Sequence, residues 1–471
     1  MDKLSEILQQ KFGHTSFREG QKEIIEQVIA GKDVVAILPT GMGKSLLYQL
    51  PAYFMKGAVV IVSPLLSLMQ DQVEQLKMFG EKRVVAINSF LTYEQKEMVM
   101  SNLAMYKFIF TSPEMLQNKR FNCALSSISI AYIVADEAHC ISQWGYDFRP
   151  DYLRISNWLD AFPEANVLAL TATATQKVVD DIKGTLHMSN PFEFIHSLDR
   201  PTIAYEVQKA DSQKEKEAWI MGRITTTNGP GILYTQSRKK AEYYAYELEK
   251  KGVKVAFYHA KLEQEDRVLV QQQFQQGDLD WICATNAFGM GIHKDNIRQI
   301  IHDHIPTSIA SYMQEVGRAA RDGKQSIASL IYTNSDVEQA FYVAMKDFPD
   351  ETDIHAAFQS EEYQILLPET TFRILSYWKE ILSEQETIAL FHDIKKRKWL
   401  EIQKLFTLFQ SELCIREQIL NTFDEQLTTK PKNCCFNCSL DLQQLLTKRE
   451  YQNLENIELN WFNRINELLR P

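Results

Sequence analysis

The segment LPTGMGKS, at residues 38–45, carries side chains and backbone groups suited to binding a nucleotide. An apolar run leads into a glycine-bearing turn whose backbone N–H groups can hold phosphate oxygens. The amine of Lys44 would then contact the outer phosphates, and the hydroxyl of Ser45 would bind Mg²⁺. Leu38 stands where the longer form of this motif has Gly, so the match is to the shorter form. A plain strand-to-helix turn is the alternative to a nucleotide-binding loop formed by Thr40, Gly41, Met42, Gly43, Lys44 and Ser45.

Two adjacent carboxylates end another apolar run, IAYIVADE at residues 130–137. Ligands of open parallel sheets bind beyond the carboxyl ends of the strands, so Asp136 would face the same crevice as the glycine turn and could hold Mg²⁺. Glu137 could then orient and deprotonate the attacking water. A solvated acidic strand end is the alternative, which the glycine turn upstream disfavours.

A third segment, SYMQEVGRAARDG at residues 311–323, carries two positively charged arginine side chains. Arg318 and Arg321 are three residues apart, so on a helix they would share a face and could point at a γ-phosphate as arginine fingers do. A solvated basic helix is the alternative.

Strand-like runs alternate with helix-like segments and would position these groups. The runs begin near residues 33, 58, 108, 130 and 166, and a second series begins near 231, 254, 281, 297 and 327. This rhythm predicts parallel sheets wrapped by helices, in two tandem α/β domains. Strand-like runs cease near residue 336, so we expect domains at 1–200 and 201–336, a helical subdomain at 337–441 and a short helical tail at 442–471.

Composition narrows the protein class. The chain has 471 residues, 45% apolar content and a net charge of −10. We expect no membrane segment and no secretion signal, and therefore a cytoplasmic protein, associated with the nucleoid if bacterial. The negative charge argues weakly against nucleic acid, although clustering of Lys and Arg matters more than the sum. Four of the seven cysteines gather at the C-terminal end, which in a reducing compartment suggests a metal before a disulfide.

Several ordered motifs together resemble the RecQ-type ATP-dependent DNA helicases of superfamily 2. They include FGHTSFREGQ (12–21), PTGMGKS (39–45), DEAHCISQWGYDFRP (136–150), LTATAT (170–175) and QEVGRAARDG (314–323). The resemblance implies an α/β fold, with two tandem RecA-like parallel-sheet domains followed by a helical zinc-binding subdomain. We expect a short form without the winged-helix and C-terminal helical domains of the family. We expect the tail to form amphipathic helices that dock on the zinc region or on a partner.

The implied activity is an ATP-dependent 3′–5′ DNA helicase or translocase that acts on single-stranded and forked DNA in repair and recombination. The implied cofactors are ATP, Mg²⁺ and Zn²⁺, and the expected state is a monomer with single-strand-binding or recombination proteins as partners. The alternative is a DNA-stimulated ATPase that remodels forks or loads other factors with little processive unwinding. An RNA helicase is a weaker third reading.

The resemblance also assigns residues. Arg18 and Gln21 would recognise adenine, and His14 would stack on it where the family often has an aromatic. Gln314 would act in hydrolysis with the two arginines. The residues expected to sense single-stranded DNA by stacking and phosphate contact are Trp144, Phe148 and Arg149, with core packing as the alternative.

Zinc would be held by Cys414, Cys435 and Cys438, with Asp441 in place of the family's last cysteine. Cys434 is the alternative fourth ligand, although its adjacency to Cys435 makes joint ligation awkward. A metal-free cluster of buried thiols is the remaining alternative. Ala320 departs from the glycine common in the family, a change of one methyl group that we expect activity to tolerate.

Overall fold

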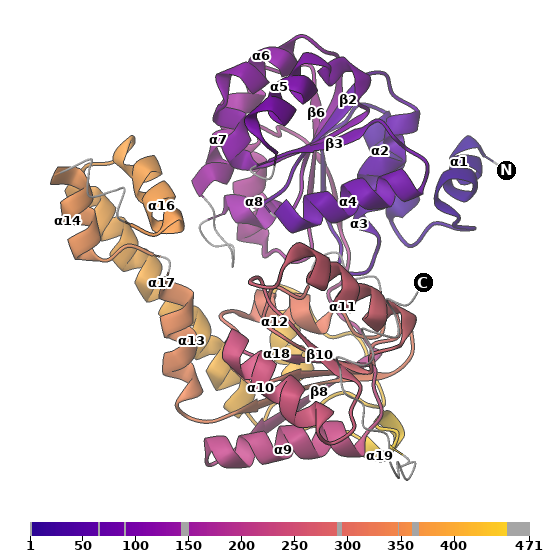
Figure 1. Ribbon diagram of the computed structural model, residues 1–471, viewed down its shortest axis with the longest axis vertical. Helices are drawn as coiled ribbons and strands as arrows, with labels where there is room; N and C mark the ends of the chain where they lie inside the picture. Colours follow the sequence, from indigo (N-terminus) through magenta and orange to yellow (C-terminus); the bar gives the residue numbers. More distant parts are fainter. Residues whose placement is uncertain are drawn as a thin grey trace, which may run out of the picture.

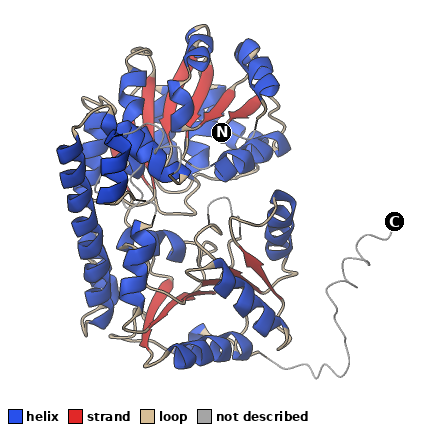
Figure 2. Cartoon of the chain, turned by 60° about the vertical axis from the view of Figure 1, so that its left-hand side comes forward, coloured by secondary structure: helices blue, strands red, loops and turns tan. Residues whose placement is uncertain are grey.

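The computed structural model describes residues 2–64, 66–88, 91–142, 150–289, 294–346, 348–359 and 367–449. Two α/β domains lie one above the other, and a helical arm runs along one side of both (Figures 1 and 2). Every pairing between the named strands of each domain is parallel, as the alternating pattern predicts.

The first domain contains a seven-stranded sheet in the order β3-β4-β2-β5-β6-β1-β7. Its strands are β1 (Val34–Ile37), β2 (Ala58–Val62), β3 (Val84–Ile87), β4 (Phe108–Thr111), β5 (Ile130–Ala135), β6 (Asn166–Thr171) and β7 (Phe192–Ile195). The helices packed on one face are α1 (Lys3–Phe12), α2 (Gln21–Ile29), α3 (Lys44–Gln49) and α4 (Leu66–Met78). The other face is covered by α5 (Tyr93–Ser101), α6 (Lys119–Ser126), α7 (Pro150–Leu159) and α8 (Gln176–Thr185). Four short 3-10 helices complete the domain: η1 (Pro51–Tyr53), η2 (Leu103–Met105), η3 (Pro113–Gln117) and η4 (Ala138–Ile141).

The second domain contains a six-stranded sheet in the order β10-β11-β9-β12-β13-β8. Its strands are β8 (Ile203–Lys209), β9 (Gly231–Tyr234), β10 (Val255–Tyr258), β11 (Trp281–Ala284), β12 (Gln299–His302) and β13 (Ser326–Tyr332). One face packs on α9 (Gln213–Thr226) and α10 (Arg238–Glu249). The other packs on α11 (Gln264–Gln276), α12 (Ile309–Val316) and parts of the C-terminal region.

The C-terminal region is helical, as predicted, and its helices from α13 to α17 form the arm (Figure 1). Its helices are α13 (Asp336–Met345), α14 (Glu351–Gln359), α16 (Glu369–Lys379), α17 (Glu384–Gln410), α18 (Ile415–Thr422) and α19 (Leu442–Leu445). α17 begins with a capping box in which Ser383 and Glu386 satisfy each other's backbone N–H groups. Ion pairs from Arg373 to Glu114 and from Glu380 to Arg154 tie the arm to the first domain. The end of α17 and α18 pack on the second sheet, so the arm joins both domains.

Candidate nucleotide site and cysteine cluster

The glycine turn lies between β1 and α3, as the sequence predicts. Gly41 and Gly43 have φ values of +88° and +75°, which a residue with a side chain rarely adopts. A Cβ atom at Gly43 would lie 2.7 Å from the side chain of Gln21, and one at Gly41 would lie 2.9 Å from that of Arg321. Both positions therefore require glycine. Lys44 begins α3, and its Nζ is buried without a hydrogen-bond partner in the described part of the chain, which fits an amine that binds phosphate.

The two carboxylates lie where β5 ends, beside the glycine turn. Glu137 adopts a left-handed backbone with φ 49°, and its Oε1 lies 3.6 Å from Lys44 Nζ. Burial, together with repulsion from Glu137, raises the pKa of Asp136 to about 7, although Lys44 opposes the shift. A divalent cation beside the carboxylate would favour its charged form. The Ser45 hydroxyl and the Asp136 carboxylate line the same pocket and fit the oxygen ligands that Mg²⁺ prefers.

His139 links the expected base to the strand that carries LTATAT. Its Nδ1 lies 3.4 Å from Glu137 Oε2 and 2.9 Å from Thr171 Oγ1, and the Thr171 hydroxyl donates to the carbonyl of Thr173 at 3.2 Å. The histidine is buried. The imidazole therefore lies between the Glu137 carboxylate and the Thr171 hydroxyl. The sequence placed His139 in the family motif without indicating this contact.

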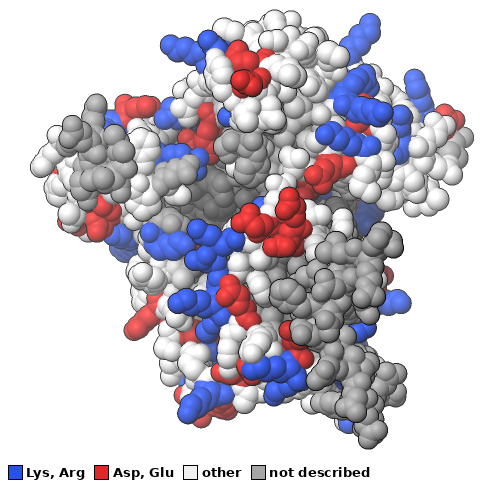
Figure 3. Space-filling model, viewed as in Figure 1, with Lys and Arg blue, Asp and Glu red and all other residues white. Residues whose placement is uncertain are grey.

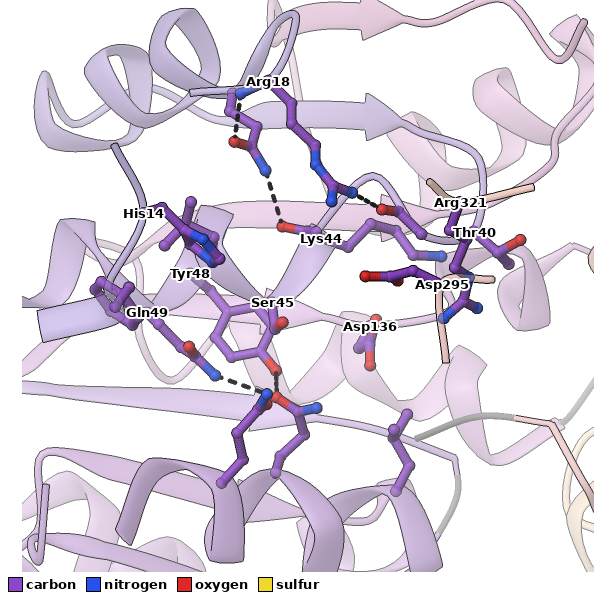
Figure 4. Close-up of a pocket in the computed structure, with 18 of the residues that line it drawn as sticks. His14, Arg18, Thr40, Lys44, Ser45, Tyr48, Gln49, Asp136, Asp295 and Arg321 are labelled. Atoms are coloured by element: carbon purple, nitrogen blue, oxygen red, sulfur yellow. Dashed lines mark hydrogen bonds between the residues drawn. The ribbon is translucent and has the colours of Figure 1, made fainter. Parts of the chain in front are cut away.

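Arg318 and Arg321 both line the same pocket from the second domain, and Figure 4 shows Arg321 beside Thr40 of the glycine turn. One expectation is wrong here, because α12 ends at Val316 and the arginines lie in the turn after it. Ala320 has a left-handed backbone with φ 55°, which is incompatible with a continuing helix. Arg318 donates to the carbonyl of Gly289, and burial followed by the charge of Arg318 lowers the pKa of Arg321 to about 10. Asp295, which the sequence did not single out, lines this side of the pocket too.

The far end of the pocket holds the residues expected to recognise adenine. His14 lines it with Phe12 and Phe79, whose ring centroids are 5.9 Å apart. The Gln21 side chain donates to the carbonyl of Met42 at 2.8 Å and accepts from the Arg18 backbone at 2.8 Å, while the Arg18 guanidinium donates to the carbonyl of Gly41. Gln21 and Arg18 thus support the glycine turn, and their contact with adenine stays a prediction.

Gln314 does not line this pocket among the described residues. It lies at the seam between the domains with Thr40, Thr173 and Arg200. Its assignment to hydrolysis stays a prediction. Trp144, Phe148 and Arg149 fall in residues 143–149, which lie outside the described part of the chain, so their assignment to DNA stays a prediction as well.

Four cysteine sulfurs converge in the C-terminal region. Those of Cys414, Cys434, Cys435 and Cys438 all lie within 4.8 Å of one another. The Cys414 sulfur lies 3.6 Å from that of Cys434 and 3.9 Å from that of Cys435. Zinc–thiolate bonds of about 2.3 Å in a tetrahedron require sulfurs about 3.8 Å apart, so these thiols fit a structural Zn²⁺.

Asp441 is not part of this cluster, and the expectation that it is the fourth ligand is wrong. Its carboxylate accepts from the backbone N–H groups of Gln443 and Gln444 and caps α19. Cys434 takes its place because the chain reverses direction here: Cys438 N–H donates to the Cys435 carbonyl, and Cys434 N–H donates to the Ser439 carbonyl. This reversal brings both neighbouring thiols to one side.

Known proteins with the same architecture define the class. The DEAD/DEAH box helicase family matches residues 18–182, and the helicase conserved C-terminal domain matches residues 215–323. The structure of the DEAD-box helicase Mss116 bound to ssRNA and UDP-BeF shares the fold with a TM-score of 0.58 at 17% identity, covering 86% of this chain and 90% of that one. The two family matches, one in each α/β domain, make this chain a superfamily 2 helicase.

More similar relatives define the family. The chain is 39% identical to the "Probable ATP-dependent DNA helicase RecS" of Bacillus subtilis, over 99% of this chain and 98% of that protein. It is 41% identical to the ATP-dependent DNA helicase RecQ of Haemophilus influenzae, over 70% of this chain and 53% of that protein. The chain belongs to the RecQ family of ATP-dependent DNA helicases. It spans about half the length of the RecQ proteins and nearly all of RecS.

None of the helices in the described residues combines the length and apolar character needed to cross a membrane.

Proposed function

We propose that this protein is an ATP-driven translocase that moves 3′ to 5′ along single-stranded DNA and unwinds forked and 3′-tailed duplexes in repair and recombination. The observation that carries the proposal is the pocket shared by the two domains. Lys44, Asp136 and Glu137 line it from the first domain, and Arg318 and Arg321 line it from the second. Hydrolysis that requires both sets can be coupled to opening and closing of the domains.

The roles of the residues follow from where they lie. Lys44 and the N–H groups of the glycine turn would bind phosphates, and Ser45 and Asp136 would hold Mg²⁺, which neutralises phosphate charge when bound. The Glu137 carboxylate would take the proton of the attacking water, with His139 fixing its orientation. Arg318 and Arg321 would stabilise charge that develops on the γ-phosphate.

We expect segment 143–149 to bind DNA, since in the sequence it comes directly after the segment that carries Glu137 and His139. The bound strand would act on hydrolysis through this short connection. Phosphate contacts carry no base code, so we expect no sequence specificity. Figure 3 shows Lys and Arg side chains in separate groups with Asp and Glu between them, so we expect local groups of cations to attract DNA despite the negative net charge. We place the protein in the cytoplasm as a monomer that works with single-strand-binding or recombination proteins.

The alternative is a DNA-stimulated ATPase that remodels forks without processive unwinding, because the same pocket serves both activities. The test compares 3′-tailed, 5′-tailed, forked and blunt duplexes in one unwinding assay, with ATP turnover measured alongside. We expect unwinding of the 3′-tailed and forked substrates, and Lys44→Ala and Glu137→Gln should each abolish ATP turnover while DNA binding remains. ATP turnover stimulated by DNA without strand separation would favour the remodelling factor, and separation of only the 5′-tailed substrate would refute the polarity.

A further inference from the structure

The segment that joins the two domains, residues 196–202, runs between β7 and β8 and carries an arginine whose role no motif explains. Arg200 Nη1 donates to the carbonyls of Thr40, at 3.3 Å, and Gly317, at 3.4 Å. Its Nη2 donates to the carbonyls of Ala319, at 3.1 Å, and Ala320, at 3.0 Å. One guanidinium therefore holds the phosphate-binding turn of the first domain and the arginine-bearing turn of the second.

This contact bears directly on the geometry of hydrolysis. Gly317 and Ala319 flank Arg318, and Ala320 precedes Arg321, so Arg200 holds the backbone on both sides of Arg318 and directly before Arg321. The approach is close, since a Cβ atom at Gly317 would lie 2.2 Å from Thr40 Oγ1. Even a small displacement of a group that stabilises a transition state can lower the reaction rate greatly.

The cysteine-bearing module, residues 414–441, holds this joining segment in turn. Arg416 at the start of α18 has a side chain only 1% exposed and donates to the Asp199 carboxylate and to the carbonyl of Arg200, the latter at 3.1 Å. Nη1 makes both of these bonds, and Nη2 of Arg416 donates to the carbonyl of Ile203. Arg416 follows Cys414, the N-cap residue of α18, by two positions. The helix that begins at one cysteine of the cluster therefore contacts the backbone of Arg200 directly.

The cysteine-bearing module also contacts both ends of the segment that joins the two domains. Glu425, after α18, accepts from the Ser197 hydroxyl and from the Leu198 backbone, the latter at 2.9 Å, on the side of the first domain. On the other side, Tyr205 of β8 exchanges backbone hydrogen bonds with the strand of the cluster, at 3.2 Å to the Cys434 carbonyl and 2.8 Å from Phe436 N–H. The joining segment is held from both ends by one module.

We propose that Arg200 is a positioning residue for ATP hydrolysis, and that Arg416 of the cysteine module holds it in place. The module, once it binds Zn²⁺, then acts as a clamp on the joint between the two domains and sets the alignment of Arg318 and Arg321 with the phosphate-binding turn. This inference rests on the ATP hydrolysis of the proposed function and adds two residues to it.

The test is a double-mutant cycle on the full-length protein, with Arg200→Ala, Arg416→Lys and the combination. Lysine at position 416 keeps the positive charge, but its single amine cannot replace the two guanidinium nitrogens that donate to Asp199, Arg200 and Ile203. Single-stranded-DNA-stimulated ATP turnover gives kcat and KM, and a fluorescent ATP analogue gives nucleotide affinity. Zinc content and thermal unfolding report on the module itself. Arg449→Ala is the matched control. Arg449 also belongs to the C-terminal region, but it forms an ion pair with Asp280 of the second domain and not with the segment that joins the two domains.

For Arg200→Ala we expect kcat to fall about tenfold or more with nucleotide affinity within about threefold, because the loss falls on the transition state. Arg416→Lys should lower kcat about threefold to tenfold with zinc content unchanged, and the double variant should resemble Arg200→Ala because both act through one contact. The control should stay within about twofold of the wild type.

A kcat for Arg200→Ala within about twofold of the wild type overturns the inference, as does a double variant whose loss is the product of the two single losses. Should Arg200→Ala fail to fold, Arg200→Lys takes its place, since it keeps the charge without the fork of donors, and the same outcomes decide. A wild-type protein without ATP turnover would instead overturn the proposed function, and this inference with it.

Discussion

The buried carboxylate of Asp136 should make the stability of the first domain depend on pH, and Asp136→Asn should remove that dependence. Burial and the neighbouring Glu137 raise the pKa of Asp136 from 3.8 to about 7 in the folded chain. Between these values the unfolded chain has lost the proton and the folded chain has kept it. The unfolded state then binds fewer protons, so stability falls as pH rises through this window and stays low above it.

The size of the effect follows from the same two values. A separation of about three pH units at about 1.4 kcal/mol per unit gives about 4 kcal/mol. Asparagine has nearly the same shape and no proton to lose. The free energy of unfolding of Asp136→Asn minus that of the wild type should therefore grow by about 4 kcal/mol from pH 4 to pH 7 and change little above pH 7.

The assay is urea unfolding followed by circular dichroism at a series of pH values, without nucleotide or Mg²⁺. Chelators are omitted so that the cysteine cluster is left alone. Glu164→Gln, at an exposed position in the turn before β6, is the matched control and should show no such growth. A difference between Asp136→Asn and wild type that is the same at pH 5 and pH 8 would show that Asp136 is already ionised at pH 5, and the account of its burial would fail.

Two further predictions concern the cysteine cluster and the arginine-bearing turn. Cys434→Ser should weaken zinc binding by at least about tenfold, since even partners of metal ligands have effects of that size, whereas Asp441→Asn should leave it unchanged. Metal analysis after dialysis against a zinc buffer measures this, with Cys283→Ser as the control, and equal losses for Cys434→Ser and Cys283→Ser would contradict the assigned ligand set. Ala320→Gly relieves a left-handed alanine worth about 1 kcal/mol but adds about 0.5–1 kcal/mol of backbone entropy to the unfolded chain, so stability should change by less than about 1 kcal/mol. Its kcat should stay near that of the wild type in the ATPase assay, and a large loss would show that the Ala320 methyl group has a part in the site.

The sequence predicted those parts of the site whose chemistry is local. Each of three motifs is confined to a few consecutive residues: the glycine turn, the pair of carboxylates and the pair of arginines. The residue types and spacing within each motif therefore indicate its chemistry. Most strands were also predicted, because the central ones are short continuous apolar runs. The strands β3, β7 and β8 were not. In β8, Glu206 interrupts the apolar pattern. Its buried carboxylate is compensated by Arg223, which donates to both oxygens at 2.9 Å, and by the Ser329 hydroxyl, which donates to one of them at 2.6 Å.

The contacts that join distant segments were beyond prediction. Arg200 and Arg416 are 216 residues apart and meet through backbone carbonyls, which leave no trace in residue type. The same holds for Arg200 and Thr40. Two neighbouring cysteines are awkward joint ligands where the chain is extended, because adjacent side chains then point to opposite faces. The reversal between Cys434 and Ser439 removes that objection, and no glycine marks it in the sequence.

The nucleotide site holds two groups whose pKa values are displaced toward their neutral forms. That of Asp136 is raised to about 7 by burial and Glu137, and that of Arg321 is lowered to about 10 by burial and Arg318. A magnesium nucleotide supplies a cation beside the carboxylate and anionic oxygens beside the guanidinium, so it would favour the charged form of both. The two groups enter the pocket from different domains. Part of the free energy of binding can therefore be released only when the two domains approach each other, which is the property that a motor built from two domains requires.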